Sequence, residues 1–357
     1  MHKSNLGQAN RSSYGLEVDK SDAEKIRKIL VNENLLDESL RILKLGQSIV
    51  FPVKNIDRVK SLTTNLKFFR IEIFNFPIKQ RRPRTLKEAL AEILENSKLS
   101  LLPSSYDVVG DIAIIQLRPE IESISKDIAV GIMRINPSIK VVLGEKGKIS
   151  GTYRLPQLVH LAGEERTRTI HKENSCIFEL DVSRVYFSPR LSNERRRIYE
   201  QVDSDEVVID MFAGVGPFSI EIAHHRGAKV KAIEINPVAY EFLKHNIQLN
   251  RVDRLVEPIL GDAASVVLKF KSYADRIIMN YPVGSLDYLE HAVEALKPCG
   301  TIHIYGFSES VNQWLRAVST RLNQLGVDDY RITGKLVREV APRRYNVVAD
   351  VKLAFDP

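Results

Sequence analysis

Two glycines and two acids are spaced as they are in sites that hold a nucleoside. Gly214 and Gly216 follow the apolar run 207–209, and Asp210 stands between that run and the glycines. Glycines allow a tight turn and let a ligand approach the start of the next helix closely. Roughly twenty residues further on, Glu234 lies near the end of a second apolar run, where an acid can accept hydrogen bonds from ribose hydroxyls. The pattern predicts a nucleoside-cofactor site.

Charge at the first strand end distinguishes between nucleoside cofactors. A dinucleotide brings its pyrophosphate to the Gly-rich turn, where the carboxylate of Asp210 would repel it. The third glycine of the dinucleotide pattern is also replaced, by Ser219. S-adenosylmethionine instead presents a sulfonium and an amino group, which an acid favours. The residues therefore indicate a methyltransferase-type domain; the alternative is an ordinary doubly wound sheet whose glycines serve only packing.

Two further polar residues follow later apolar runs. Asp262 could accept a hydrogen bond from an adenine amine, or it could only cap the next helix. Asn280 opens the triplet Asn280-Tyr281-Pro282, where an amide offers a donor and an acceptor to a base edge and proline holds the backbone still. The triplet resembles the Asn-Pro-Pro-aromatic signature of amino-group methyltransferases without matching it. A plain strand-to-loop turn is the alternative interpretation.

A regular alternation of elements in the C-terminal half must position these residues. Helical patterns separate five apolar runs, at 207–209, 229–235, 255–260, 276–279 and 301–305. Strands that alternate with helices pair in parallel, and ligands bind beyond their carboxyl ends. A short connection joins two last runs, 331–340 and 346–354, so these two strands are antiparallel. We expect an α/β class I (Rossmann-like) methyltransferase domain with a seven-stranded, mostly parallel sheet.

Two smaller α/β or α+β domains are expected before that domain. The expected divisions are an N-terminal module at 1–76, a middle domain at 77–184 and the methyltransferase domain at 185–357. Residues 1–15 read as a flexible tail. The linker after the first module contains four basic residues, Lys79, Arg81, Arg82 and Arg84. The N-terminal module either only adds stability or docks a distant part of a large substrate.

Apolar spacing in the middle domain predicts a compact α+β fold. The expected helices are 86–94 and 119–136, and the expected strands are 107–117, 140–143, 151–155, 167–172 and 175–181. A helix starting near Asn193 leads into the cofactor strand.

Composition narrows the classes of protein. With 44% hydrophobic and 27% charged residues, the chain is typical of globular proteins. It has no apolar run of about 18 residues, as a membrane span would need, and its polar N-terminus lacks a secretory-signal core, so we expect a cytoplasmic protein. A net charge of +7, with basic clusters such as 195–197, favours a nucleic-acid substrate. No His, Cys and acid residues show ligand spacing, so no metal is expected.

Five long runs of sequence together are typical of one enzyme family. The runs are Ser105-Tyr106-Asp107-Val108-Val109-Gly110-Asp111, His160-Leu161-Ala162-Gly163-Glu164, Thr169-Ile170-His171-Lys172-Glu173-Asn174, Val185-Tyr186-Phe187-Ser188-Pro189-Arg190-Leu191 with Glu194-Arg195, and Asp210-Met211-Phe212-Ala213-Gly214-Val215-Gly216-Pro217-Phe218-Ser219. Through them, residues 21–357 resemble the archaeal and eukaryotic tRNA guanine-N1-methyltransferases that act at position 37, beside the anticodon.

The resemblance implies roles that the residues alone would not give. Judged only by their sequence neighbours, Glu194 is a residue in the first turn of a helix and Arg154 is a surface arginine. The family implies that Glu194 is the base, that Arg154 binds the guanine oxygen, and that Asn280 orients the flipped base. It further implies tRNA as partner and agrees with S-adenosylmethionine as cofactor; separately, we expect a monomer. For the cofactor, the expected residues are Phe212, Asn236, Asn280, Pro282 and Arg190, in addition to Asp210, Gly214, Gly216, Glu234 and Asp262. For the substrate, they are Tyr186, Pro282 and Arg195, in addition to Arg154.

One departure from the family leaves the substrate range open. The family usually has Asn-Leu-Pro where this chain has Asn280-Tyr281-Pro282. Some archaeal members also methylate a tricyclic wyosine precursor made from the same guanine. A sister group transfers an aminocarboxypropyl group from the same cofactor, but lacks the Asn-x-Pro element and the Ser-Pro-Arg-Leu turn that are present here. A catalytically silent tRNA-binding protein is a further alternative, and a dehydrogenase is the least favoured.

Overall fold

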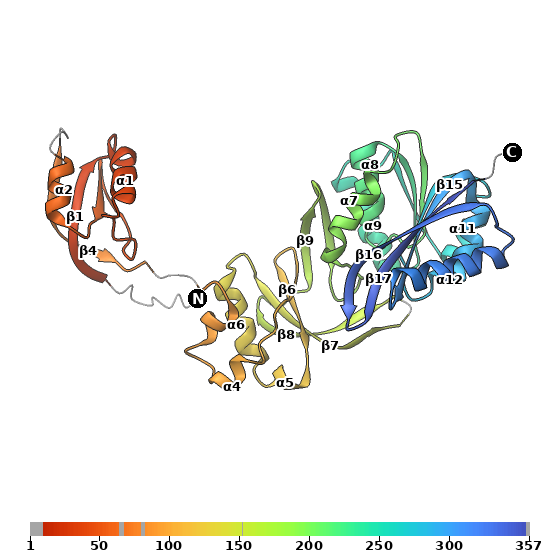
Figure 1. The fold of residues 1–357 in the computed structure, drawn as a ribbon, viewed down its shortest axis with the longest axis horizontal. Helices are drawn as coiled ribbons and strands as arrows, with labels where there is room; N and C mark the ends of the chain where they lie inside the picture. The colour runs from red at the N-terminus through yellow and green to blue at the C-terminus, as the bar shows by residue number, and fades with distance from the viewer. Residues whose placement is uncertain (1–9, 64–67, 80–82, 152, 355–357) are drawn as a thin grey trace. The chain divides into compact units, whose positions relative to one another are not determined.

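The computed structural model describes residues 10–63, 68–79, 83–151 and 153–354 (Figure 1). They form two compact units, Met1–Pro83 and Arg84–Pro357. Arg81 and Arg82 of the basic linker, and residues 1–9 of the expected tail, lie outside the described residues.

The N-terminal unit is a four-stranded antiparallel sheet with the order β2-β3-β1-β4. Its elements are β1 Asn10–Asp19, α1 Ala23–Asn32, β2 Leu43–Leu45, β3 Ser48–Pro52, α2 Ile56–Thr63 and β4 Phe69–Pro77. Leu16 and Val18 of β1 pack in one core with Ile26 and Leu30 of α1. The prediction of a flexible tail is wrong for residues 10–15, because this part of β1 pairs with β4, and from Gly15 onward β1 also pairs with β3.

The first part of the second unit is the expected α+β region. Its elements are α3 Leu86–Leu90, α4 Asn96–Leu99, β5 Asp107–Val109, β6 Ile112–Leu117, α5 Pro119–Glu122, α6 Ser125–Ile135, β7 Val141–Ser150, β8 Leu155–Gly163, β9 Arg168–Glu173 and β10 Cys176–Asp181. Strands β5-β6-β7-β8 form one sheet, and β9 and β10 form a hairpin.

Three local predictions in this region are wrong. Residues 107–117 form two strands that are separated by a tight turn. In this turn Gly110 has a φ of +59°, which glycine adopts readily. The expected helix 119–136 is divided into α5 and α6. Of the expected strand 151–155, residues 151, 153 and 154 lie in the turn between β7 and β8, while Leu155 begins β8, whose remaining residues were not predicted as a strand. In that turn Arg154 has a φ of +55°.

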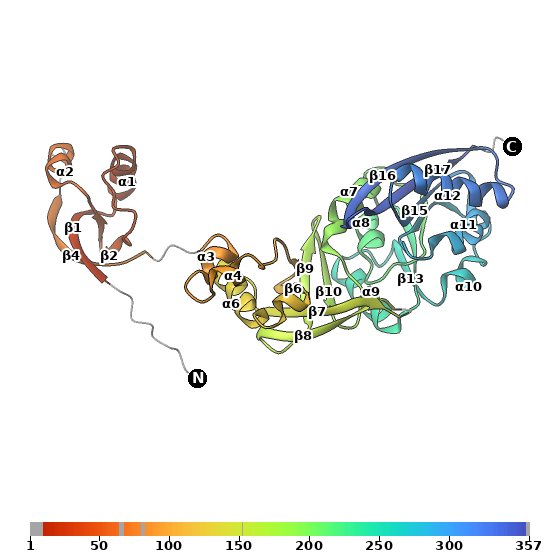
Figure 2. The same ribbon diagram turned by 60° about the horizontal axis from the view of Figure 1, so that its bottom comes forward.

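The expected seven-stranded sheet is confirmed, in the order β13-β12-β11-β14-β15-β17-β16. Strands β17 and β16 are the last two at one edge of the sheet (Figure 2). Among the described strands of this sheet, β17 alone runs antiparallel to both of its neighbours. The elements are η1 Pro189–Leu191, α7 Ser192–Tyr199, β11 Val207–Asp210, α8 Pro217–Arg226, β12 Lys229–Glu234, α9 Pro237–Leu249, β13 Val256–Leu260, α10 Ala263–Val267, β14 Ala274–Met279, η2 Ser285–Tyr288, α11 Leu289–Ala295, β15 Leu296–Ser308, α12 Val311–Gln324, β16 Tyr330–Ala341 and β17 Arg344–Leu353.

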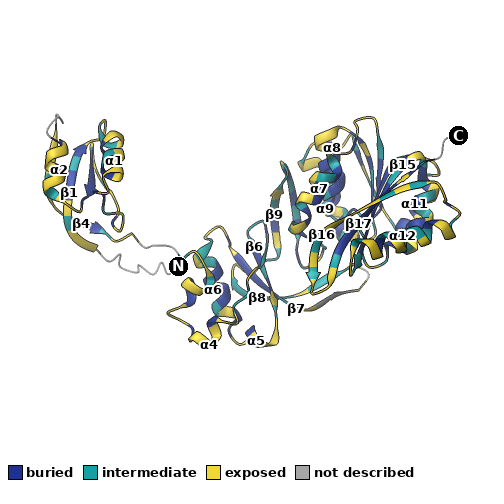
Figure 3. Cartoon of the chain, in the orientation of Figure 1, coloured by how far each residue is buried: buried dark blue, intermediate teal, exposed yellow. Residues whose placement is uncertain are grey.

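Helices cover both faces of this sheet and bury it (Figure 3). On one face Val208 packs with Ile220 of α8 and Leu243 of α9. On the other face Ile209 packs with Leu289 of α11, and the sheet also contacts α10 and α12. Burial on both faces explains why the strands read as continuous apolar runs.

The β9–β10 hairpin is fixed to the sheet domain through α9. Phe178 and Leu180 of β10 belong to the same core as α8 and α9. Asn246 of α9 and Asn250, which caps its C-terminal end, each accept a backbone N–H of β10 at 2.8 Å and donate to its carbonyls. This attachment holds the middle region against the sheet; the boundary at residue 184 stays a prediction.

Candidate functional site

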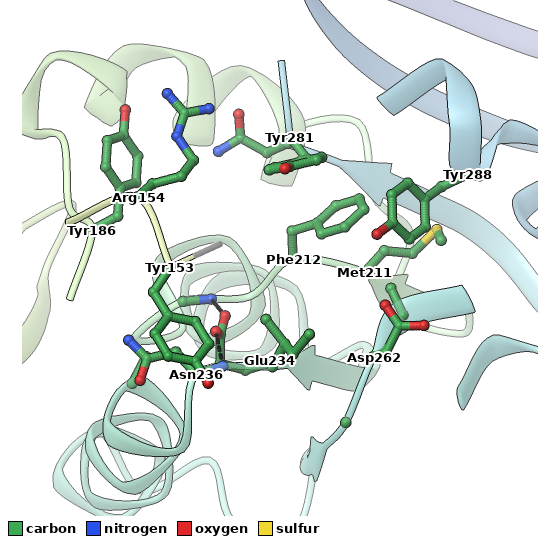
Figure 4. A pocket seen from close by; sticks show the side chains of 16 residues that line it. Tyr153, Arg154, Tyr186, Met211, Phe212, Glu234, Asn236, Asp262, Tyr281 and Tyr288 are labelled. Carbon is green, nitrogen blue, oxygen red and sulfur yellow. Dashed lines mark hydrogen bonds between the residues drawn. The ribbon is translucent and has the colours of Figure 1, made fainter. Parts of the chain in front are cut away.

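A pocket lies at the carboxyl ends of β11, β12, β13 and β14, where the sequence predicted a nucleoside site. It holds about 760 Å³ of space not filled by atoms, open solvent at its mouth included. Figure 4 shows Arg154 and Tyr186 on one side of it and Asp262 and Tyr288 on the other. The lining residues are Tyr153, Arg154, Tyr186, Met211, Phe212, Gly214, Glu234, Ile235, Asn236, Ala239, Gly261, Asp262, Ala263, Asn280, Tyr281 and Tyr288.

Glycines shape the turn between β11 and α8. Gly214 has a φ of +59° and lines the pocket, while Gly216 has a φ of +93° and is the N-cap of α8. A Cβ on Gly216 would lie 2.5 Å from Leu243 and 2.8 Å from Ile220. Gly216 is therefore required by conformation and by packing, although it does not line the pocket.

Glu234 fastens the Gly-rich turn to the end of β12. Its Oε2 accepts the backbone N–H of Gly214 at 2.7 Å, and its Oε1 accepts that of Asn236 at 2.7 Å. Burial raises the pKa of Glu234 above its ordinary value, and these two hydrogen bonds oppose that rise. Asn236 caps α9 by accepting the N–H of Val238, so both predicted residues face the pocket from a rigid turn.

Asp210 does not stand at the rim of the pocket as the sequence suggested. Its side chain is buried, and it accepts a hydrogen bond from the Ser219 hydroxyl at 2.8 Å. Burial raises the pKa of Asp210 to about 7. Asp210 thus supports the turn from the protein interior, and its predicted contact with the cofactor stays a prediction.

Asp262 is the helix cap that the sequence allowed, and its predicted hydrogen bond to adenine stays a prediction. It caps α10 by accepting the backbone N–H of Ser265 at 3.3 Å, and it also lines the pocket. Beside it stands an aromatic wall that the sequence reasoning missed. Phe212 stacks on Tyr281 with ring centroids 5.1 Å apart, and Tyr288 meets Phe212 edge to face at 5.1 Å. Tyr281 stood within the Asn-Tyr-Pro triplet, but no local signal marked Tyr288.

Arg154, Tyr186 and Asn280 meet at the opposite side of the pocket, although they come from distant parts of the chain. The guanidinium carbon of Arg154 lies 5.2 Å from the centroid of the Tyr186 ring. Asn280 follows β14 directly. A cationic donor group, a phenol and an amide thus face one space, which suits recognition of a polar aromatic ring.

Glu194 does not line the pocket. It is 4% exposed, and its carboxylate accepts hydrogen bonds from Arg197 at 2.7 Å and from the hydroxyl of Tyr305 at 2.8 Å. Hydrogen bonds of a catalytic group are often rearranged when substrate binds, so this pairing leaves the predicted role as base open.

Arg190, Arg195 and Pro282 also lie outside the pocket lining. Arg195 is 2% exposed, with its guanidinium bound to Glu173 and to the carbonyl of Ser188. Arg195 is thus held in a buried ion pair, and its predicted contact with substrate stays a prediction. Arg190 is paired with an aspartate, Asp107, and lines a second cavity that shares two residues with the pocket, Arg154 and Tyr186.

Folding also brings together three side chains of metal-ligating type that sequence spacing did not indicate. Within the described ranges, Cys176 of β10 and His224 and His225 of α8 place ligand atoms within 4.8 Å of one another. His225 already donates to the carbonyl of Asn174 at 2.6 Å and stacks on Tyr199.

Three family models match successive parts of the chain. They are the tRNA methyltransferase 5 N-terminal domain at 15–60, the TYW2 N-terminal domain at 86–167 and the TRM5/TYW2 methyltransferase domain at 169–328. A tRNA (guanine(37)-N(1))-methyltransferase, Trm5b of Pyrococcus abyssi, is 37% identical over 346 residues, which cover 96% of this chain and 100% of that protein. The chain belongs to the TRM5/TYW2 methyltransferase family.

Other members of the TRM5/TYW2 family resemble this chain over different lengths. The tRNA 4-demethylwyosine(37)-methyltransferase Taw21 of Saccharolobus solfataricus is 38% identical over 69% of this chain and 92% of its own length. The structure of aTrm5 in complex with tRNALeu superposes with a TM-score of 0.75 and 34% identity, covering 95% of this chain and 99% of that one. The M. jannaschii TYW2 structure in complex with AdoMet gives a TM-score of 0.53 and 30% identity, covering 71% and 100%.

The class I methyltransferase fold predicted from the sequence is thus confirmed by its strand order and by these relatives. Within the described ranges, every helix is too short or too polar to span a lipid bilayer.

Proposed function

We propose that this chain is an S-adenosylmethionine-dependent tRNA methyltransferase that methylates N1 of guanine 37, beside the anticodon. The observation that carries the proposal is that one pocket has two unlike halves. Glu234 and Asp262 stand in the half that suits a nucleoside donor, while Arg154 and Asn280 stand in the half that suits a base. The full-length likeness to a guanine-37 methyltransferase agrees with this division.

The residues of the donor half fit S-adenosylmethionine. The carboxylate of Glu234 is held by two backbone N–H groups and can still accept from ribose hydroxyls. Asp262 can accept from an adenine amine, and Phe212 and Ile235 offer apolar surface to the base. When bound, S-adenosylmethionine supplies a methyl group carried on a sulfonium sulfur.

The residues of the acceptor half suit a guanine taken out of the anticodon loop. N1 of a paired or stacked guanine is inaccessible, so the base must be flipped into the pocket. There Arg154 donates to O6, where negative charge develops as N1 loses its proton. Asn280 holds the base edge with its amide, and Tyr186 packs beside it. Glu194 takes the N1 proton as the general base, and the methyl group bonds to N1 as the sulfur–carbon bond breaks.

The tRNA is held by more than the pocket. The net charge of +7 favours a polyanion. We assign the compact N-terminal unit to docking on a distant part of the tRNA; support comes from its separate core and from its match to the tRNA methyltransferase 5 N-terminal domain. The three-domain division remains part of this proposal. We further propose that the enzyme acts as a monomer in the cytoplasm.

The test is transfer of a labelled methyl group to unmodified tRNA, followed by nuclease digestion and mass spectrometry. We expect 1-methylguanosine at position 37 and nowhere else. Label on another nucleoside, or none, contradicts the proposal. In a parallel assay, S-adenosylmethionine labelled in its carboxyl group should leave the tRNA unlabelled, because only aminocarboxypropyl transfer would carry that label.

A second acceptor is 4-demethylwyosine at position 37. It is favoured by the likeness to Taw21, and Tyr281, where the family usually has leucine, changes the lining of the pocket. The same assay with tRNA that carries this base tests the second acceptor. A product nucleoside heavier by one methyl group supports it, and an unchanged mass contradicts it.

A further inference from the structure

Glu194 is one end of a chain of buried and partly buried ionisable groups that crosses the sheet. The guanidinium of Arg197 donates to Glu194 at 2.7 Å and, through Nη1, to Asp350 of β17 at 2.6 Å. Asp350 lies opposite His303 of β15 in the strand register, and its Oδ1 is 2.6 Å from His303 Nδ1. On the other side of that ring, Nη1 of Arg276 is 2.7 Å from His303 Nε2.

The hydrogen-bond directions in this chain fix the charge of each member. A guanidinium can only donate, so Nε2 of His303 must accept from Arg276, and Nδ1 then carries the proton that is donated to Asp350. His303 is therefore neutral, in agreement with burial, which lowers its pKa. Burial would raise the pKa of Asp350, but hydrogen bonds from His303 and Arg197 hold it well below its usual value. Arg276 is itself neutralised by Glu206, at 2.7 Å.

Arg197 thus lies between two carboxylates, and this matters when Glu194 gains a proton. A buried guanidinium whose only partner became neutral would be left as an unpaired charge, which is strongly unfavourable. Asp350 remains ionised and keeps Arg197 paired. The uptake of a proton by Glu194 is then made easier by the presence of Asp350.

The hydroxyl of Tyr305 acts on Glu194 in the opposite sense. Tyr305 is completely buried, and burial raises the pKa of its phenol well above 10, so it is always a donor. Its bond to Glu194 stabilises the carboxylate rather than the acid. In the described part of the chain, Arg197 and Tyr305 are the side chains that hydrogen-bond Glu194.

We propose that Asp350 and Tyr305 are positioning residues that set the proton affinity of Glu194, Asp350 raising it and Tyr305 lowering it. The inference rests on the proposed function of Glu194 as the base. It goes beyond that function by assigning opposite effects to two residues that do not face the pocket.

Single-turnover methyl transfer to tRNA, measured as a function of pH at saturating donor, tests the inference. The rate rises with pH as the base loses its proton, and this acid limb reports the proton affinity of Glu194. Asp350→Asn should move the limb to lower pH by about one unit and lower the plateau, because the base becomes weaker. Tyr305→Phe should move it to higher pH by about one unit, with little loss of plateau rate.

Matched controls separate these effects from general damage. Asp275→Asn removes a carboxylate of β14 that pairs with Lys297, and Tyr330→Phe removes a phenol of β16 that contacts Asn323; neither should move the limb. Shifts of both test variants in one direction, or no shift in either, overturn the inference. If Asp350→Asn fails to fold, Tyr305→Phe alone decides: a limb that stays in place or moves to lower pH refutes it. Failure of the proposed function would look different, because Glu194→Gln would then keep the wild-type rate and limb.

Discussion

Replacement of Glu234 by glutamine should weaken donor binding far more than its small chemical change suggests. Both carboxylate oxygens accept backbone N–H groups at 2.7 Å, one from Gly214 in the Gly-rich turn and one from Asn236. Glutamine offers one oxygen and one NH₂ group, so one of the two amides would face another donor in a buried site.

The expected cost follows from that geometry. The turn that glutamine cannot hold in place must be reordered when the donor binds, so binding loses about the value of one hydrogen bond to a charged acceptor, about 1.5–3 kcal/mol. This corresponds to a roughly 10- to 150-fold weaker affinity at about 1.4 kcal/mol per factor of ten. Titration calorimetry with S-adenosylhomocysteine measures it. Glu257→Gln on β13 is the matched control, because its salt bridge to Lys231 is largely exposed and should contribute little. An affinity of Glu234→Gln within threefold of wild type would refute the reasoning.

Three further predictions concern stability and turnover. Burial raises the pKa of Glu221 to about 8, from 4.5, so the folded state holds a proton that the unfolded state releases, and stability should fall as pH rises through that window. Glu221→Gln should flatten the fall in melting temperature between pH 5 and about 8, and an equally steep fall would contradict this. Gly216→Ala should lower stability by about 2–4 kcal/mol, seen in urea unfolding, since its Cβ would meet Leu243 at 2.5 Å in a left-handed backbone. Arg154→Ala should reduce the single-turnover methyl-transfer rate by roughly 100-fold, while calorimetry should show an unchanged affinity for the methyl donor. An equally large loss of donor affinity would contradict the assignment of Arg154 to the guanine half of the pocket.

The sheet could be predicted from the sequence because its signals are local. Strands buried on both faces read as apolar runs, and polar residues at their ends, such as Glu234, Asp262 and Asn280, fall at one edge of a parallel sheet. The turn at Arg154 was predicted as a strand because its sequence is typical of a strand. In the structure Arg154 has a positive φ and lies in the turn of the β7–β8 hairpin.

The surroundings of the site could not be predicted, because they depend on long-range packing. Arg197 is three residues from Glu194 on one helix, so helical spacing could have paired them. Tyr305 and Asp350 lie more than a hundred residues away along the chain, and only the fold brings them to that pair. The burial of Asp210 was missed for the same reason: its sequence neighbours do not tell whether the strand end is covered.

The central claim is that Glu194 removes the N1 proton of a guanine held between Arg154 and Asn280. It is tested most directly by comparing Glu194→Gln with the wild-type enzyme in single-turnover transfer of labelled methyl to guanine 37 of unmodified tRNA. The account predicts a rate at least about 100-fold lower, with donor and tRNA affinities unchanged. A rate within a few-fold of wild type would contradict it.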